Sequence, residues 1–317
     1  MKSLTATAIA LITLAVAGLP AAHADTAADR LVSTWTLAAL EHESGGGEPT
    51  RIRGAHGLLI LDGAGHAFEF FDAARREAGD PSLSDAQRTF AEFGGFWGHY
   101  AADAGTGRID FTAEDGVSPN VSALTFTRDY ALDGDRLVLT STDEPQAQRN
   151  TRWTWERVPT VENLSPTYRQ VIGFWQHVEE RQVNEATGEI VRTNRRAPSV
   201  IVYTPGGFVG VHFPPLGRKR FAGATPTAEE AQTALRGYIG YFGALSVYPG
   251  EVSHNILTGI SPTPGSILRR YADIDGDTLV VRLEPLFRSA SDRRRATRTE
   301  VVLHRLSGAD DMLPRTR

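Results

Sequence analysis

The chain has no cysteine and only two lysines, Lys2 and Lys219, among its 317 residues. The absence of cysteine excludes disulfide bonds, thiol chemistry and thiolate metal sites, so burial of apolar side chains must stabilise the fold. The positive charge is therefore almost entirely arginine, and the formal net charge is −5. This balance provides no basic surface of the kind that binds nucleic acid, and we expect no nucleic-acid partner.

The sequence also lacks the common signatures of catalytic and cofactor sites. It contains no G-x-S-x-G elbow, no phosphate loop, no dinucleotide fingerprint and no H-E-x-x-H motif. His42 stands between Glu41 and Glu43, but in an extended segment it would point away from both, so we interpret this stretch as a solvated loop. We expect no cofactor and no metal, and whether the protein is an enzyme stays open.

A long apolar run occurs only at the N-terminus. Lys2 precedes an apolar stretch over residues 4–19, and Ala22-His23-Ala24 is a small-x-small cleavage site. This pattern predicts a signal peptide over residues 1–24, cleaved after Ala24, and a protein exported to the periplasm or the extracellular space. The run is too short to cross a membrane, and we expect no transmembrane segment elsewhere.

The rest of the chain consists of two related halves. An Asp-Gly-Asp turn at residues 133–135 recurs at 275–277, which is an offset of 142 residues. Trp35 and Trp175 open corresponding strands near the start of each half. We therefore predict a tandem duplication, with barrel 1 over residues 25–160, barrel 2 over 161–309, a C-terminal tail over 310–317 and a linker near 156–164.

Each half shows about eight short alternating segments and one helix, which predicts two antiparallel barrels of an all-β class. Ser84 and Thr227 have the residue types that cap helices. Apolar residues at helical spacing follow each cap, and we expect these helices to cover one mouth of each barrel. They are Phe90, Phe93 and Trp97 in the first half, and Leu235, Tyr238, Ile239 and Phe242 in the second. Ser165-Pro166 predicts a further short helix that closes one barrel end.

The second half resembles the bacterial lipocalin-like domain family through six motifs in the same order. They are Gly173-Phe-Trp175, Ile201-Val-Tyr-Thr-Pro-Gly-Gly207, Thr227-Ala-Glu-Glu-Ala231, Gly237-Tyr-Ile-Gly-Tyr-Phe-Gly243, Val252-Ser-His254 and Asp275-Gly-Asp-Thr-Leu279. The first half departs from this pattern, because Asp62-Gly63 replaces Thr-Pro and Phe111 replaces the histidine. The resemblance implies a calycin-type barrel with an internal cavity, and the family has no well-defined activity.

An eight-stranded barrel is wide enough to hold one small ligand. Aromatic and polar side chains of the second half are candidates for lining such a cavity, and the alternative is that they fill the barrel with satisfied hydrogen bonds. These candidates are Tyr203, His212, Tyr238, Tyr241, Phe242, His254 and Arg270. The main hypothesis is an exported tandem lipocalin-like protein that binds a small apolar or amphipathic molecule.

Two other classes of function stay open. A cofactor-independent isomerase, cyclase or hydratase would need a polar pair inside the second barrel, and His254 with Arg270 or Tyr203 would supply it. A protein with two filled barrels would instead dock a protein partner in the groove between them. Arg218-Lys219-Arg220 is a candidate anion contact near the barrel mouth or a solvated charge run, and the arginines at 293–295 predict a hairpin tip.

Overall fold

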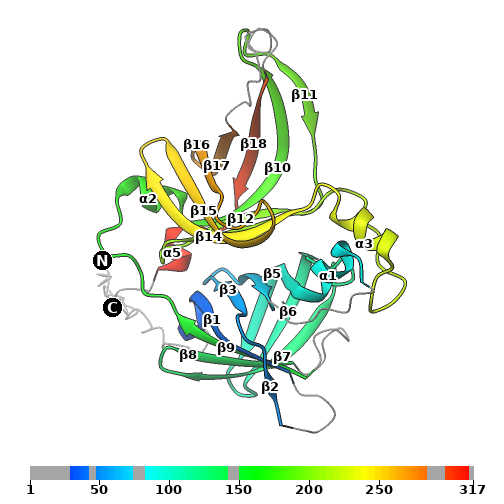
Figure 1. Cartoon of the computed structure of the whole chain (residues 1–317). Helices are drawn as coiled ribbons and strands as arrows, with labels where there is room; N and C mark the ends of the chain where they lie inside the picture. Colours follow the sequence, from blue (N-terminus) through cyan, green and yellow to red (C-terminus); the bar gives the residue numbers. More distant parts are fainter. Residues whose placement is uncertain (1–28, 43–47, 74–82, 142–149, 284–296, 314–317) are drawn as a thin grey trace, which may run out of the picture.

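The computed structural model describes residues 29–42, 48–73, 83–141, 150–283 and 297–313. These residues form two closed antiparallel barrels of eight strands, and each has one additional short strand paired with its first strand. Figure 1 shows one barrel above the other. The predicted fold class, two tandem all-β barrels, is confirmed. The predicted signal peptide and the hairpin tip at 293–295 lie outside the described residues.

The two barrels have the same element order. The first comprises η1 (Asp29–Leu31), β1 (Ser33–His42), β2 (Thr50–Arg51), β3 (His56–Leu61), β4 (His66–Asp72), α1 (Asp85–Glu92), β5 (Phe93–Asp103), β6 (Arg108–Gly116), β7 (Thr125–Asp133), β8 (Arg136–Ser141) and β9 (Thr151–Arg157). The second comprises α2 (Pro166–Val171), β10 (Gly173–Asn184), β11 (Ile190–Asn194), β12 (Val200–Tyr203), β13 (Phe208–Phe213), α3 (Ala228–Leu235), β14 (Ile239–Tyr248), β15 (Glu251–Ser261), β16 (Ile267–Asp275), β17 (Thr278–Leu283) and β18 (Thr297–Arg305), and α5 (Ala309–Met312) follows. The first strand of each barrel pairs with the last, which closes the sheet.

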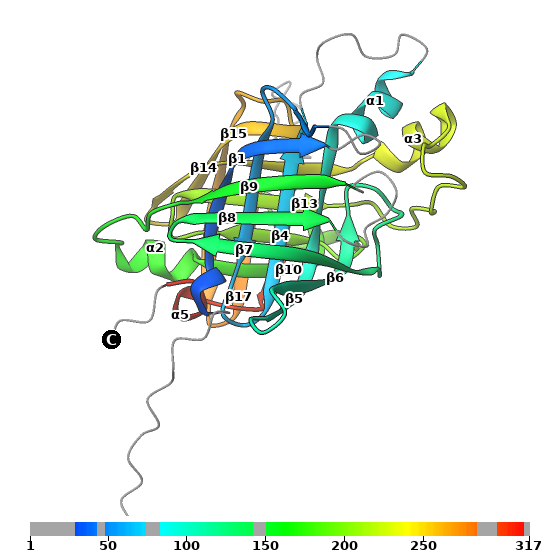
Figure 2. The ribbon, with the colours of Figure 1, turned by 90° about the horizontal axis from the view of Figure 1, so that it is seen from below.

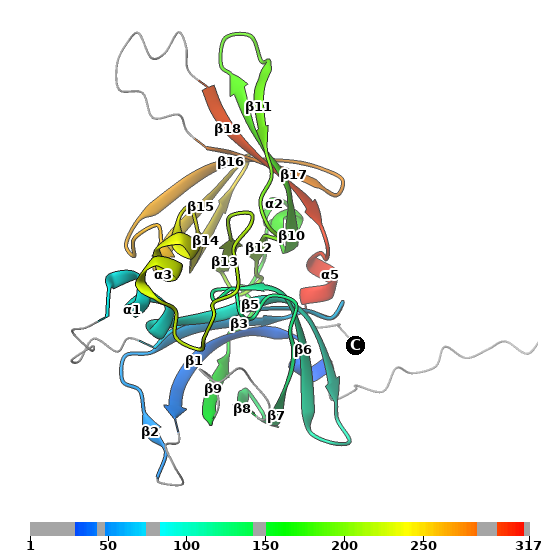
Figure 3. The same cartoon turned by 90° about the vertical axis from the view of Figure 1, so that its right-hand side faces the viewer.

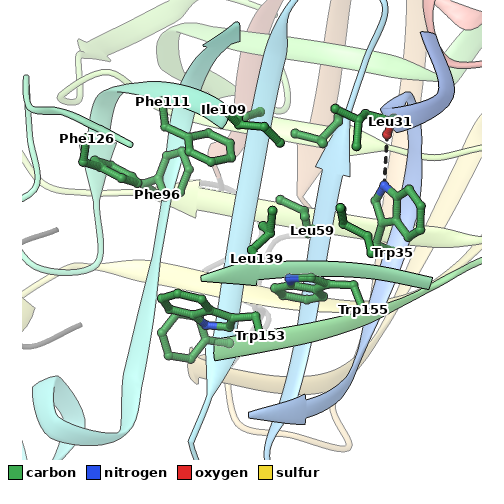
Figure 4. Packing of buried hydrophobic residues seen from close by; sticks show 14 of the residues in the cluster. Leu31, Trp35, Leu59, Phe96, Ile109, Phe111, Phe126, Leu139, Trp153 and Trp155 are labelled. Carbon is green, nitrogen blue, oxygen red and sulfur yellow. Dashed lines mark hydrogen bonds between the residues drawn. The ribbon is translucent and has the colours of Figure 1, made fainter. Parts of the chain in front are cut away.

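A short helix and a tryptophan close one end of each barrel. Trp175 is buried, donates its ring N–H to the Val171 carbonyl over 2.7 Å and lies under the Arg305 guanidinium, 4.0 Å from the ring centroid. Trp35 makes the same contacts in the first barrel, where it donates to the Leu31 carbonyl over 3.1 Å, and Figure 4 shows this bond. The short helix predicted from Ser165-Pro166 is therefore present.

The main helix of each repeat is shorter than its apolar pattern predicts. The caps are confirmed, but α1 ends at Glu92 and α3 at Leu235, so Trp97 and Phe242 lie in strands rather than on helices. Glycines explain the difference, because each costs about 1 kcal/mol in a helix interior. A side chain at Gly98 would place its Cβ 2.1 Å from the Thr112 carbonyl oxygen, so the strand pairing requires glycine there.

The outer faces of the two barrels pack against each other through a continuous apolar cluster. Its buried members are Leu58, Ile60, Phe68, Phe70, Trp97, Val117, Ile172, Phe174, Val200, Val202, Tyr238, Phe242 and Met312. The Phe68 ring occupies the space above Gly210, where a Cβ would lie 2.5 Å from the ring. Helices α1 and α3 lie together at one side of this junction rather than each covering a barrel mouth, and Figure 3 shows α5 at the opposite side.

Polar contacts also connect the barrels. Arg218 is not a solvated charge: its side chain is 5% exposed, and it donates to the Asp115 carboxylate and to the carbonyls of Gly116 and Val117. The segment expected as a tail begins within α5, whose Asp311 carbonyl accepts the Gly63 N–H over 2.7 Å. Helix α5 is therefore part of the junction that Figures 1 and 2 show.

Candidate functional site

Three of the predicted site residues meet inside the second barrel. Tyr203 on β12, Tyr241 on β14 and His254 on β15 all belong to the inner face, because alternate residues of a strand point to the same side. The His254 ring bridges the two phenols, with Nδ1 2.8 Å from the Tyr241 hydroxyl and Nε2 3.2 Å from the Tyr203 hydroxyl. All three side chains are buried, so they form a polar chain in an apolar interior.

Burial keeps this chain electrically neutral. Desolvation, together with the charge of Arg270, lowers the pKa of His254 to about 3, so the ring is neutral at pH 7. Desolvation also raises the pKa values of Tyr203 and Tyr241, and both phenols stay protonated. A neutral imidazole has one N–H and one acceptor nitrogen, so one phenol donates to the ring and the other accepts from it. The accepting phenol retains its own O–H for a further acceptor.

Arg270 projects to the same interior from β16. Leu268, Arg270 and Ala272 are every second residue of this strand, so they share its inner face. The positive charge of Arg270 contributes to the pKa shifts of Tyr203, Tyr241 and His254. Its side chain is half-buried, and Nη1 donates to the Arg269 carbonyl over 2.9 Å. The second barrel therefore brings together Tyr203, Tyr241, His254 and a cation.

The other three candidates lie on the outer side of this barrel. His212, Tyr238 and Phe242 belong to the junction with the first barrel, so the expectation that they face the barrel interior is wrong. His212 points outward because it follows the inward Val211 on the same strand. Its Nδ1 lies 2.9 Å from the Tyr238 hydroxyl, and desolvation lowers its pKa to about 3. These residues join the barrels rather than line a ligand site inside one of them.

His177 is an inner-face residue that the sequence analysis missed. It lies opposite Leu303 in the β10–β18 pairing, and its ring packs 5.4 Å from the Phe213 ring. Nε2 is buried and has no hydrogen-bond partner among the described residues. Desolvation lowers its pKa. No motif marks this histidine, but it is two residues after the inward Trp175, and this alternation would have placed it on the inner face.

The first barrel shows how the same interior is filled. Arg128 of the first barrel is the equivalent of Arg270. Arg128 pairs with Ile109, and Arg270 pairs with Val252 at the equivalent position of the second barrel. Arg128 is fully buried and forms an ion pair with the fully buried Glu69. Aromatic rings surround its guanidinium, with the Trp153 centroid at 4.0 Å and those of Phe111, Phe126 and Phe96 at 5.3, 5.5 and 5.9 Å. Figure 4 shows these rings gathered in the interior.

The groups that enclose Arg128 are mostly smaller in the second barrel. The strand pairings identify the equivalent positions of the two barrels. Trp153, Phe126 and Phe111 of the first barrel correspond to Val301, Leu268 and His254 of the second. Phe96 and Glu69 correspond to Tyr241 and Val211. Elsewhere in the interior the second barrel has the larger side chain, with Tyr203 in place of Leu61 and Ile256 in place of Ala113. The exposure of the side chains differs accordingly: Phe126 and Arg128 are buried, whereas Leu268 and Arg270 are half-buried.

The described residues give no indication of a metal site. Among residues 29–42, 48–73, 83–141, 150–283 and 297–313, no group of three or more histidine, aspartate or glutamate side chains is placed to bind a metal ion. His42 ends strand β1, so the expectation of a loop there is wrong. Of the helices that the structure describes, none has the length and apolar content needed to cross a membrane.

Comparison with known families gives one result for the second barrel. Residues 172–306 match the family model of the lipocalin-like domain, and the match extends from just before β10 to just after β18. No curated protein matches the chain. The second barrel is therefore similar to the lipocalin-like domain from β10 to β18, and the first barrel repeats its architecture.

Proposed function

We propose that the chain is a binding protein whose second barrel takes up one small apolar or amphipathic molecule. The observation that carries this proposal is the contrast between Arg128, enclosed by rings and Glu69, and Arg270, which has smaller and partly exposed neighbours. The lipocalin-like match over the second barrel supports a binding fold. The first barrel has a filled interior and serves as a structural partner.

The chemistry of the interior favours binding over catalysis. Ligand sites are commonly apolar with a few placed polar groups, and Tyr203 and Tyr241 belong to the same interior cluster as Leu268, Val281 and Val301. Both ring nitrogens of His254 are engaged by the two phenols, so the ring presents no nitrogen to a ligand as a general base. The polar chain instead offers a phenol O–H as a hydrogen-bond donor.

Refilling the second barrel tests this function. The double variant Leu268→Phe/Val301→Trp gives the second barrel two of the rings that enclose the arginine of the first. We expect its affinity for a neutral probe, N-phenyl-1-naphthylamine, to fall by at least tenfold. Fluorescence titration of the full chain measures the affinity and the stoichiometry, which we expect to be one probe per chain.

The matched control places a ring on the outer face of the same strand. Ile267 is 67% exposed, so Ile267→Phe is expected to leave the probe affinity unchanged. Circular dichroism and thermal unfolding establish that both variants fold. Equal probe affinity in the refilled variant, or no probe binding by the wild-type chain, would overturn the assignment of a ligand site to this barrel.

We also propose that the protein acts outside the cytoplasm. The support is the N-terminal sequence, in which a positive residue, an apolar run and the Ala22-His23-Ala24 site occur in the order of a signal peptide. The full sequence expressed in a bacterial host is expected to yield a chain in the periplasmic or culture fraction that begins at Asp25. N-terminal sequencing checks this, and recovery of an intact Met1 in the cytoplasmic fraction would contradict it.

A further inference from the structure

We infer that the ligand of the second barrel carries a carboxylate, which binds beside Arg270 in the place that the Glu69 side chain takes beside Arg128. This inference rests on the proposed function, because it names the chemical class of ligand for the same interior. The two barrels share one backbone plan, so the first provides a direct template for how an acid reaches the arginine of the second.

The template is a bidentate ion pair across the barrel interior. Arg128 on β7 donates an N–H from each terminal nitrogen to Glu69 on β4, with Nη2 3.0 Å from Oε1 and Nη1 in contact with Oε2. Strands β4 and β7 are not neighbours in the sheet, so the carboxylate approaches from within the barrel. Parallel N–H bonds to both oxygens of a carboxylate are the strongest contact that a guanidinium makes.

The second barrel keeps the arginine but not the acid. The position equivalent to Glu69 is Val211, which is 3% exposed and points to the same interior. Arg270 already makes contacts in the structure, including the hydrogen bond that it donates to the Arg269 carbonyl. A ligand carboxylate would bind in addition to these contacts or replace them. A carboxylate brought by a ligand would therefore have the charge partner that Glu69 has, without a competing acid at position 211.

The Tyr203–His254–Tyr241 chain provides a second contact for the same group. One phenol proton is used within the chain, and the other phenol retains an O–H for an external acceptor. His254 and Val252 are alternate residues of β15, and Val252 pairs with Arg270 on β16, so the donor and the cation lie in one region of the interior. A carboxylate accepts from both, whereas a neutral alcohol gains little from the guanidinium.

Matched pairs of acid and alcohol test the inference. Decanoate with 1-decanol, and 4-butylbenzoate with 4-butylbenzyl alcohol, are titrated at pH 7.5 as competitors of N-phenyl-1-naphthylamine on the full chain. We expect each acid to displace the probe at least tenfold more strongly than its alcohol. Arg270→Leu is expected to bring each pair to within about twofold, with the alcohol still able to compete.

A second set of variants rebuilds the template. Val211→Glu supplies an internal carboxylate and is expected to remove the preference for acids, whereas Val211→Gln adds similar bulk without charge and is expected to keep it. Ile267→Glu, on the exposed face of β16, controls for added negative charge and is expected to keep the preference. Circular dichroism monitors folding, and Arg270→Leu decides the question if Val211→Glu does not fold.

The outcomes separate the inference from the proposed function. Equal competition by acids and alcohols in the wild-type chain overturns the carboxylate and leaves a binding barrel. An acid preference that survives Arg270→Leu overturns the assignment to this arginine. If the wild-type chain binds neither the probe nor any competitor, the proposed function itself fails.

Discussion

Replacing Glu69 by leucine is expected to lower the free energy of unfolding by about 3–5 kcal/mol, the usual cost of leaving one member of a buried ion pair alone. Glu69 and Arg128 are both fully buried, so the variant leaves a desolvated guanidinium that water cannot reach. Urea denaturation at pH 7, followed by tryptophan fluorescence and circular dichroism, measures the change.

The double variant Glu69→Leu/Arg128→Met distinguishes a lost ion pair from lost packing. Removing both charges is often close to neutral, so we expect the double variant to recover most of the stability lost in the single one. Arg270→Leu is the matched change in the second barrel, and because Arg270 is half-buried we expect it to cost less than about 1 kcal/mol. Equal losses in the single and double variants would show that the charges are not coupled.

The second large effect is expected on mild acidification. His212 and His254 titrate near 6.5 in an unfolded chain and near 3 in the fold, so between these values the unfolded chain binds more protons. Stability is therefore complete above about pH 6.5 and falls as the pH decreases. Integration gives a loss of about 2 kcal/mol per histidine between pH 7 and pH 5, or about 4 kcal/mol for both.

Asparagine variants separate the two histidines. The charges that act on His212 are Asp115 and Arg218, and the charge that acts on His254 is Arg270. His212→Asn and His254→Asn each remove one titrating ring, so each is expected to reduce the loss between pH 7 and pH 5 by about 2 kcal/mol, whatever its effect at pH 7. Urea denaturation of the wild-type chain and both variants at pH 7 and pH 5 provides the free energies of unfolding. A wild-type stability that is flat over this range would contradict the burial of both rings.

The strands and turns could be predicted because their patterns are local. Period-2 alternation separates the two faces of β13, and the Asp-Gly-Asp turns lie between β7 and β8 and between β16 and β17, with Gly134 and Gly276 at a φ of +55°. The offset of 142 residues between these turns indicated the duplication. These features depend on residues close together in the chain.

The site could be predicted only in part, because its location depends on long-range packing. Tyr238 and Phe242 occur at a spacing that also fits a helix, but Gly240 between them disfavours a helix, and Phe242 lies in β14. No local pattern shows that the outer face of β13 is covered by another barrel, so His212 resembled a cavity residue. His177 lies two residues after the inward Trp175 and before the register shift, so alternation alone would have placed it on the inner face.

The fit of Phe68 over Gly210 makes the two repeats mutually dependent. These residues are equivalent in the duplication, so a pair of identical second barrels would set glycine against glycine, and a pair of first barrels would set phenylalanine against phenylalanine. Neither half can pair with a copy of itself as it pairs with the other. The second barrel expressed alone would expose Phe174, Val202 and Phe242 to water, a patch that favours aggregation. The whole tandem chain is therefore the folding unit.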